Sequence, residues 1–398
     1  MVKLDPNGGA TIEDINRDYK TTTLDKLLGS RSIYLLKLGN NSDTEGVAEQ
    51  MGSDPRLIYA EPNFTTHAPE GGARHRAYPG GTAKPSSDPA PYRDQYAVDA
   101  MNLSCAQNVS SGSGTVVAVL DTGAQLDHPE LAGSFTQERY DFIEDDGVPE
   151  DEPNDRDDDG DGAVDEVTGH GTHVSGIAHL TAPEARIMPL RVLDSDGRGN
   201  IFVIAEAFEY AERNGADVVN MSLGSSRKSA LLGDVTGSEE DGGGSEGGEG
   251  DASVGSGGTD MVVVASAGND NTNALRYPAA EKGTIAVASV DDQEQKSSFS
   301  NYGAWIDIAA PGSEIYSPYP RGIYATWDGT SMAAPFVAGQ AALLRSDDPS
   351  LTPASVENRI ESTARPLGGG LGAGHADAGA SLDCGVPNIL TPLGSPEL

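Results

Sequence analysis

Three short stretches of this 398-residue chain carry side chains that could do nucleophilic chemistry. Ser331 lies in GTSMAAP, where small neighbours leave room for something large to approach the hydroxyl closely. The apolar spacing of the following FVAGQAALLRS predicts a helix, so Ser331 should lie at its N-terminus, where unpaired N–H groups favour negative charge. A serine in this position is either a helix cap, the ordinary role of serine there, or a nucleophile.

A serine nucleophile needs a base within hydrogen-bond reach and a carboxylate that orients this base. His170 and His173 lie in GHGTHVSGI, at a predicted helix start where glycines allow close approach. A metal pair is the alternative, but the sequence offers no further clear ligand. Asp121 ends the apolar strand TVVAVL, which places it at the carboxyl edge of a parallel sheet, where sites form. A turn-forming aspartate before glycine is the alternative interpretation of Asp121.

Together these stretches resemble those of the subtilisin-like serine proteases, or subtilases. The matching segments, in the family's order, are VAVLDTGAQLDHPEL, GHGTHVSGI, NMSLG, ASAGND and GTSMAAPFVAG. The order Asp, His, Ser is that of subtilisin. The resemblance covers residues 93–382 and implies that Ser331 is the nucleophile, His170 the general base and Asp121 its orienting carboxylate. It also implies that Asn269 donates to the oxyanion, together with the backbone N–H of Ser331.

The resemblance also implies which residues bind substrate. Ser222, Leu223 and Gly224 match a strand edge that lines the primary specificity pocket, and backbone pairing along such an edge binds extended peptides without reading their sequence. Asp270 falls at the pocket rim, where a carboxylate attracts basic residues at low salt. We therefore expect an endopeptidase of broad specificity for proteins or peptides. A catalytically silent binding protein is the rival hypothesis, but such a scaffold has no need of the whole Asp, His, Ser and Asn set.

The expected fold is α/β, with a parallel sheet flanked by helices over residues 93–382, because short apolar runs alternate with helical periods. Residues 1–64 contain MVKL, TIEDINRDYK, SIYLLKL, TEGVAEQM and RLIYA, which predict a small α+β, ferredoxin-like unit. The resemblance implies that this unit is a propeptide that inhibits the enzyme from within the same chain; an unrelated accessory domain is the alternative. Residues 65–92 are expected to form a linker that contains the activation site, and residues 383–398 a C-terminal tail.

Residues 155–166, DRDDDGDGAVDE, fit the calcium-loop pattern D-x-D-x-D-G-x5-E. Oxygen ligands at alternate positions, with a glycine for the sharp turn, suit a hard cation such as Ca²⁺. The expected ligands are Asp155, Asp157, Asp159, Asp161 through its carbonyl, and Glu166. Gly162 stands where an apolar residue is usual, and no helix pair flanks the loop, so a solvated acidic loop is the alternative.

Three features depart from the pattern of the family. Residue 168, before the GHGTH motif, is threonine instead of an acidic residue or asparagine. The chain between GIAHL and ARIMPLRVL is short, which indicates that a calcium loop found in many secreted subtilisins is missing. An acidic, glycine-rich insert within residues 225–260 replaces an ordinary helix and leaves the geometry of the cleft on that side open.

The chain carries 62 acidic and 26 basic residues, a formal net charge of −36. This charge argues against nucleic acid or an anionic membrane as a partner, and no apolar run is long enough to span a membrane. We expect a monomeric enzyme that is secreted or periplasmic, its signal not being present in this chain; a cytoplasmic protease is the alternative. Cys105 and Cys384 could form a disulfide in an oxidising compartment, or they could be two buried thiols.

Overall fold

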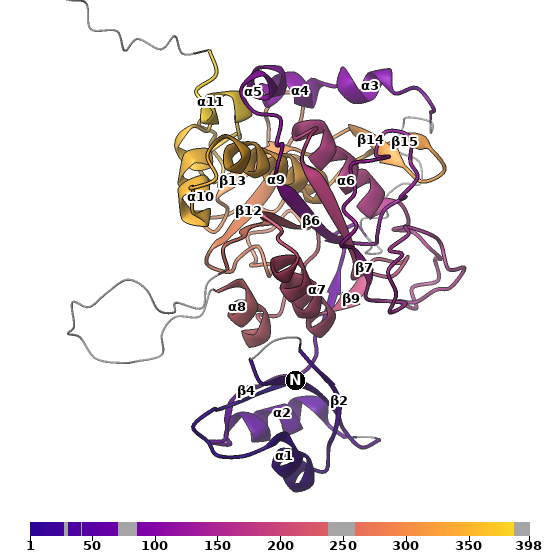
Figure 1. The fold of residues 1–398 in the computed structure, drawn as a ribbon, viewed down its shortest axis with the longest axis vertical. Helices are drawn as coiled ribbons and strands as arrows, with labels where there is room; N and C mark the ends of the chain where they lie inside the picture. The colour runs from indigo at the N-terminus through magenta and orange to yellow at the C-terminus, as the bar shows by residue number, and fades with distance from the viewer. Residues whose placement is uncertain (28–30, 41, 71–85, 238–258, 386–398) are drawn as a thin grey trace, which may run out of the picture.

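The computed structural model describes residues 1–27, 31–40, 42–70, 86–237 and 259–385. Figure 1 shows a small N-terminal unit attached to a larger unit that contains the rest of these residues. Most of the acidic, glycine-rich insert, much of the expected linker and the end of the tail lie outside the described residues. Within the described part of the chain, no helix has the length and apolar character needed to cross a membrane.

The larger unit is built on a seven-stranded sheet in which every neighbouring pair of strands is parallel. In spatial order the strands are β13 (Ile308–Pro311), β12 (Thr284–Val290), β11 (Val262–Ser266), β10 (Val218–Met221), β6 (Val116–Asp121), β8 (Arg186–Arg191) and β7 (Tyr140–Asp141). A parallel sheet needs crossover connections that cover both of its faces. The α/β architecture expected from the sequence is therefore confirmed.

Helices cover both faces of this sheet (Figure 1). On one face lie α6 (His170–Thr181), α9 (Thr330–Asp347) and α10 (Pro353–Ser362); on the other lie α7 (Ile201–Arg213) and α8 (Ala230–Thr236). Alternate side chains of β6 point to opposite faces, as a strand requires. Val117 and Val119 pack in the core with α6 and α9, whereas Ala118 and Leu120 pack in the core with α7.

Shorter elements complete the larger unit. They are α3 (Ala90–Arg93), α4 (Tyr96–Ala100), α5 (Leu103–Val109), α11 (Ala378–Ser381) and the antiparallel hairpin of β14 (Ile315–Tyr319) and β15 (Ile323–Trp327). Cys105 of α5 forms a disulfide with Cys384, which follows α11. Of the two alternatives for the cysteines, the structure thus shows the disulfide, and it ties the start of the expected C-terminal tail to the larger unit.

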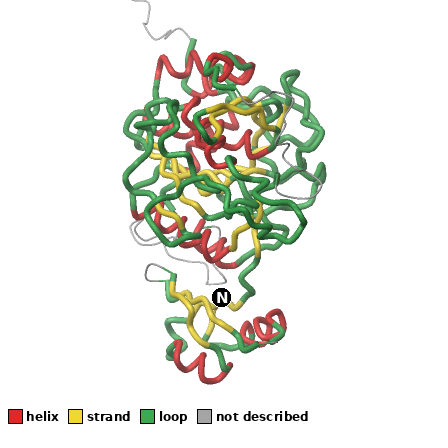
Figure 2. The backbone as a smooth tube through the Cα atoms, turned by 90° about the vertical axis from the view of Figure 1, so that its right-hand side faces the viewer, coloured by secondary structure: helices red, strands yellow, loops and turns green. Residues whose placement is uncertain are grey.

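The N-terminal unit is a four-stranded antiparallel sheet with two helices (Figures 1 and 2). Its elements are β1 (Val2–Leu4), α1 (Ile12–Tyr19), β2 (Thr22–Lys26), β3 (Ile33–Lys37), α2 (Thr44–Gly52) and β4 (Leu57–Ala60), and the strand order is β2-β3-β1-β4. This is the expected β-α-β-β-α-β pattern. The strand β2 was not predicted from the sequence, because all five of its residues are exposed and an exposed strand has no alternating apolar pattern.

The two units face each other through the sheet of the smaller one. Figure 2 shows its strands toward the larger unit and its helices on the outer side. The chain then leaves β4 and runs into the larger unit as β5 (Thr65–His67). The N-terminal unit is therefore connected to the larger unit by a segment that is itself packed against it.

Candidate active site

Three side chains from three elements meet at the carboxyl edge of the sheet. Asp121 is the last residue of β6, His170 the first of α6 and Ser331 the second of α9. His170 Nδ1 lies 2.6 Å from Asp121 Oδ1, and all three residues are fully buried. The N-cap of α9 is Gly329, so Ser331 is not the helix cap that its sequence position also allowed.

Glycines on both sides of His170 let α6 begin against the end of β6. A Cβ on Gly171 would overlap the carbonyl oxygen of Gly123, and a Cβ on Gly169 would overlap the ring of Tyr319. Gly169 also has a φ of +95°, which favours glycine. The GHGTH motif is therefore required by packing around the imidazole.

Asn269, which comes shortly after β11, points its amide nitrogen toward Ser331. The side-chain oxygen of Asn269 accepts hydrogen bonds from the N–H and from the hydroxyl of Thr330, each at 2.9 Å. These two donors fix the orientation of the amide and leave Nδ2 free to donate in the other direction. Thr330 was missed by the sequence analysis, because its only signal is its place next to Ser331.

The carboxylate of Glu70 occupies the centre of this group. Ser331 Oγ donates to Glu70 Oε2 at 2.8 Å, and His170 Nε2 lies 3.1 Å from the same oxygen. Asn269 Nδ2 donates to Glu70 Oε1 at 2.8 Å. Glu70 is only 2% exposed. The three polar groups expected to carry the chemistry therefore converge on one anionic group of the same chain.

Sequence reasoning missed Glu70, because it lies in the linker expected at residues 65–92, where no local pattern marks it. The close approach of Glu70 explains why residue 329, near Ser331, is a glycine. A Cβ on Gly329 would overlap Glu70 Oε1. Because Gly329 has no side chain, it leaves the space through which an anion can reach Asn269 and Ser331.

The charges around His170 raise the pKa of its imidazole. Burial alone lowers this pKa, but the carboxylates of Asp121 and Glu70 outweigh burial and raise it to about 10. His173 behaves in the opposite way, because burial lowers its pKa to about 3. Its Nε2 lies 3.1 Å from the carbonyl oxygens of both Ile315 and Ala325, so His173 is a neutral packing residue.

The segment before Glu70 lies as a strand between two edges of the larger unit. On one side β5 pairs antiparallel with β9 (Arg198–Asn200). On the other side His67 and Gly224 exchange hydrogen bonds, with His67 N–H donating at 3.1 Å and Gly224 N–H donating at 2.9 Å. The N–H of Ala68 donates to the carbonyl of Gly197 at 2.9 Å. The edge at Gly224, expected to bind extended peptides, is therefore filled by the chain itself.

The other two residues of this expected binding edge are fully buried, and Ser222 contacts Ser331. Ser222 Oγ donates to the backbone carbonyl of Ser331 at 3.0 Å, and Leu223 is fully buried. Ser331 Oγ lies 3.5 Å from the carbonyl oxygen of Ser222. The edge and the hydroxyl are thus held together by hydrogen bonds between β10 and α9 regions.

Residues 112–386 match the Subtilase family. The chain belongs to this family. Thermitase from Thermoactinomyces vulgaris is 38% identical over an alignment that covers 71% of this chain and 92% of thermitase. The thermophilic serine proteinase of Bacillus sp. (strain AK1) is 34% identical, over 90% of this chain and 81% of that protein.

A solved structure of a protease from Pseudoalteromonas arctica PAMC 21717 aligns with a TM-score of 0.62 and 29% identity, covering 75% of this chain and 98% of that one. The family and this structural similarity identify the protein as a subtilisin-like serine endopeptidase. The resemblance stated from the sequence motifs is thereby confirmed.

Asp270 of this subtilase, expected at the rim of the specificity pocket, carries an ion pair. The guanidinium of Arg276 bonds to Asp270 Oδ2. A neighbouring positive charge offsets the attraction of a carboxylate for a basic substrate residue. The ion pair with Arg276 therefore reduces the preference for Lys or Arg that Asp270 alone would create.

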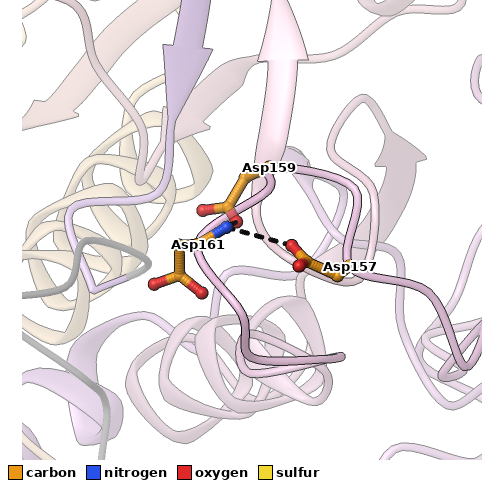
Figure 3. Close-up of side chains that lie close together, drawn as sticks. All are labelled: Asp157, Asp159 and Asp161. Atoms are coloured by element: carbon orange, nitrogen blue, oxygen red, sulfur yellow. Dashed lines mark hydrogen bonds between the residues drawn. The ribbon is translucent and has the colours of Figure 1, made fainter.

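The acidic loop of the subtilase unit brings together three of the five expected calcium ligands (Figure 3). The carboxylate oxygens of Asp157, Asp159 and Asp161 lie within 4.8 Å of one another. Asp157 accepts from the backbone N–H groups of Gly160, Asp161 and Gly162, at 2.6, 3.1 and 3.0 Å. Asp155 and Glu166 are not part of this group of carboxylates. Asp161 contributes its side-chain carboxylate to this group, whereas the sequence pattern predicted that its backbone carbonyl would be the ligand.

We expect His170 of the uncut chain to stay protonated until the pH approaches 10. Ser331→Ala should keep the chain uncut, and imidazole NMR signals should then report a midpoint near the raised pKa of about 10. Glu70→Gln in this background should lower the midpoint, because one of the two negative charges beside the ring is lost. Since the folded pKa exceeds the unfolded value of about 6.5, this stabilisation is complete below about pH 6.5 and is lost as the pH rises through 10.

Two controls belong to this titration. The signals of His173 should not move over the same range, because its imidazole is already neutral. Glu49→Gln, at an exposed position of α2, should leave the His170 midpoint unchanged. If the His170 midpoint were the same with and without the Glu70 charge, the ion pair between His170 and Glu70 would be contradicted.

Proposed function

We propose that this subtilase hydrolyses peptide bonds where Ser331, His170, Asp121 and Asn269 converge, and that its own N-terminal segment keeps it latent. The observation that carries both parts is the carboxylate of Glu70, which is hydrogen-bonded by the three groups that would handle the reacting carbonyl. An anion in this position supports a site built to stabilise negative charge. Its origin in the same chain supports latency.

In the proposed reaction Ser331 Oγ attacks the carbonyl carbon of the substrate while His170 Nε2 takes the hydroxyl proton. Asp121 accepts the Nδ1–H bond, fixes the tautomer and offsets the charge of the imidazolium. The oxygen of the tetrahedral intermediate is bonded by Asn269 Nδ2 and by the backbone N–H of Ser331. His170 then protonates the leaving amine, and water hydrolyses the acyl-enzyme by the same proton transfers.

Substrate would bind as an extended strand between β9 and Gly224. The segment Thr65–Ala68 supports this, because its contacts there are backbone hydrogen bonds. Such bonds do not depend on side-chain identity, which supports broad specificity for proteins and peptides.

Two helix caps supplied by the chain before β5 anchor the N-terminal unit. Glu61 accepts from the hydroxyl of Ser229 at 2.7 Å and from the N–H of Ala230 at 2.9 Å, at the start of α8. Asn63 Oδ1 accepts from the N–H of Phe202 at 3.1 Å, at the start of α7. Polar acceptors and negative charge are favourable at helix N-termini. These contacts support residues 1–64 as an inhibitor of this enzyme.

Ion pairs reinforce the same interface. Lys3 contacts Asp234 at 2.7 Å, and Arg31 contacts Glu209 at 2.9 Å, each pair being largely buried. Partial burial reduces screening by salt. The match to the Bacillus proteinase over 90% of this chain must include part of residues 1–64. An accessory domain with no inhibitory role would not need to be followed by a segment that contacts Ser331, His170 and Asn269.

We place the activating cut after Glu70 and before Ser86, because the residues up to Glu70 are docked and Ser86 pairs with Tyr324 of the larger unit. A cut there would leave the inhibitor bound until it dissociates or is digested. The disulfide between Cys105 and Cys384 supports a secreted or periplasmic location, because such bonds persist in oxidising compartments.

We further propose that Asp157, Asp159 and Asp161 hold a structural Ca²⁺ ion. Carboxylate oxygens are ligands that Ca²⁺ prefers, and glycine turns at Gly160 and Gly162, with φ of +80° and +93°, let the loop fold around such a site. A bound ion would supply positive charge that offsets the repulsion among the three carboxylates. Asp155 and Glu166, which the sequence pattern included, are left out of this proposal.

Ser331→Ala should abolish casein hydrolysis and labelling by a serine-directed phosphonate, because both need the hydroxyl nucleophile. Circular dichroism should show an unchanged fold. His173→Gln is the matched control for a histidine of the same helix, and it should retain labelling where it folds. Wild-type turnover in Ser331→Ala would refute the mechanism.

Glu70→Gln should weaken latency. Hydrogen bonds to a charged group contribute about 1.5–3 kcal/mol, and 1.4 kcal/mol is a factor of ten, so we expect phosphonate to label the uncut chain about 10-fold faster. Glu49→Gln, on the exposed side of the N-terminal unit, should label at the wild-type rate. Equal rates for all three chains would show that the carboxylate does not block the site.

Removal of calcium should lower the thermal midpoint of unfolding, because a ligand bound by the native state stabilises it by mass action. Asp157→Asn with Asp161→Asn should abolish most of the calcium-dependent shift. Asp155→Asn is the matched control and should keep the shift, because Asp155 is outside the cluster. A shift that survives loss of the cluster would place the ion elsewhere.

A further inference from the structure

A second buried carboxylate, Asp151, lies beside the triad and is not accounted for by the steps above. It is 2% exposed and accepts four hydrogen bonds. Oδ1 accepts from Thr122 Oγ1 at 3.1 Å and from Gly169 N–H at 2.8 Å. Oδ2 accepts from the N–H and the hydroxyl of Thr172, at 3.0 and 2.7 Å. Asp151 thus contacts the loop after β6 and the first turn of α6 at the same time.

The two threonines continue the connection between these elements. Thr122 Oγ1 accepts from the N–H of Gly171 at 2.9 Å. Thr172 Oγ1 accepts from the N–H of Gln125 at 2.9 Å. Each hydroxyl therefore donates to Asp151 and accepts from the opposite element. The network joins the residue that follows Asp121 to the residues on both sides of His170.

The sequence of α6 explains why this carboxylate comes from another part of the chain. The N-cap of α6 is Gly169, which has no side chain to cap the helix. No other residue fits there, because its Cβ would overlap Tyr319. The first N–H groups of the helix still need acceptors, and negative charge is favourable at this end. Asp151 supplies both.

Burial of Asp151 is costly unless all its hydrogen-bonding capacity is used. Burial raises the pKa of its carboxyl group, whereas the bonds from Gly169 and Thr172 oppose this change. A neutral cap would stabilise the helix start without placing a second carboxylate near Asp121. A helix cap would need contacts to α6 only. Asp151 also contacts the loop after β6, and a capping role does not explain this second contact.

We propose that Asp151 is a positioning residue for catalysis, which fixes the distance between Asp121 and His170 by holding the loop after β6 against the start of α6. This inference rests on the triad proposed above. Without Asp151, the imidazole loses its fixed orientation, and proton transfer from Ser331 is slowed. Substrate binding along β9 and Gly224 is not touched by this network, so affinity for substrate should be preserved.

The test uses the mature enzyme and compares Asp151→Asn with wild type in peptide hydrolysis. The amide nitrogen of asparagine would face two donors, so at least one side of the network must open. We expect kcat to fall at least about 10-fold, the effect of 1.4 kcal/mol, with KM changed less than about twofold. Glu152→Gln, at the exposed neighbouring position, is the matched control and should leave both parameters unchanged.

Two further variants separate positioning from stability. Thr172→Ser keeps the hydroxyl and should retain kcat, whereas Thr172→Val removes it and should lower kcat at unchanged KM. These variants also carry the test if Asp151→Asn does not fold. A folded Asp151→Asn enzyme with normal kcat, or one that only melts earlier, would overturn the proposal.

Asp121→Ala distinguishes this proposal from the mechanism on which it rests. If Asp121→Ala retains kcat, the proposed triad is wrong. If Asp121→Ala loses activity while Asp151→Asn and Thr172→Val keep it, the triad stands and only the positioning role of Asp151 is wrong.

Discussion

A carboxylate and an imidazole buried together at 2.6 Å set the requirements for the rest of the catalytic unit. Asp121 and His170 can be removed from water only if each satisfies the other, so the end of β6 and the start of α6 must meet closely. Gly171 permits the approach, because any larger residue would overlap the β6 loop. The parallel sheet supplies the common edge from which strand and helix reach this point. The glycines on both sides of His170 and the start of α6 at the end of β6 follow from that one contact.

In the proposed function, the same arrangement of donors would accommodate two different anions. The N-terminus of α9, Asn269 Nδ2 and a protonated His170 all favour negative charge at one point. In the uncut chain that charge is the carboxylate of Glu70. In the proposed reaction it is the oxygen of the tetrahedral intermediate. Because both anions would use the same donors, the proposed inhibition and the proposed reaction would exclude each other without a separate inhibitory site.

Local signals in the sequence made Asp121, His170 and Ser331 candidates, because each marks the end of a strand or the start of a helix beside glycines. Their joint role came from the resemblance of five motifs, in order, to the subtilases. The parallel sheet was also predictable from its apolar runs. Glu70 was not, since it acts through contacts with residues 100 and 261 positions away and has no pattern of its own. The calcium pattern predicted five ligands, of which the structure brings together the carboxylates of Asp157, Asp159 and Asp161, because backbone hydrogen bonds to Asp157 close the loop around these three. The spacing of residues along the sequence could not predict these contacts, because they form between residues that are brought together only by the fold.

The proposed latency would work through charge rather than through a distorted site. The bonds between Asp121 and His170, and those from Thr330 to Asn269, are already formed while Glu70 is bound. The carboxylates of Asp121 and Glu70 raise the pKa of His170 to about 10, and a protonated imidazole cannot accept the proton of Ser331. In the proposed latent form, Glu70 would block the site by filling it and would also keep the base protonated. Release of the strand, as proposed, would remove one of the two charges beside the imidazole, which could then lose its proton without any rearrangement of Asp121 or Asn269.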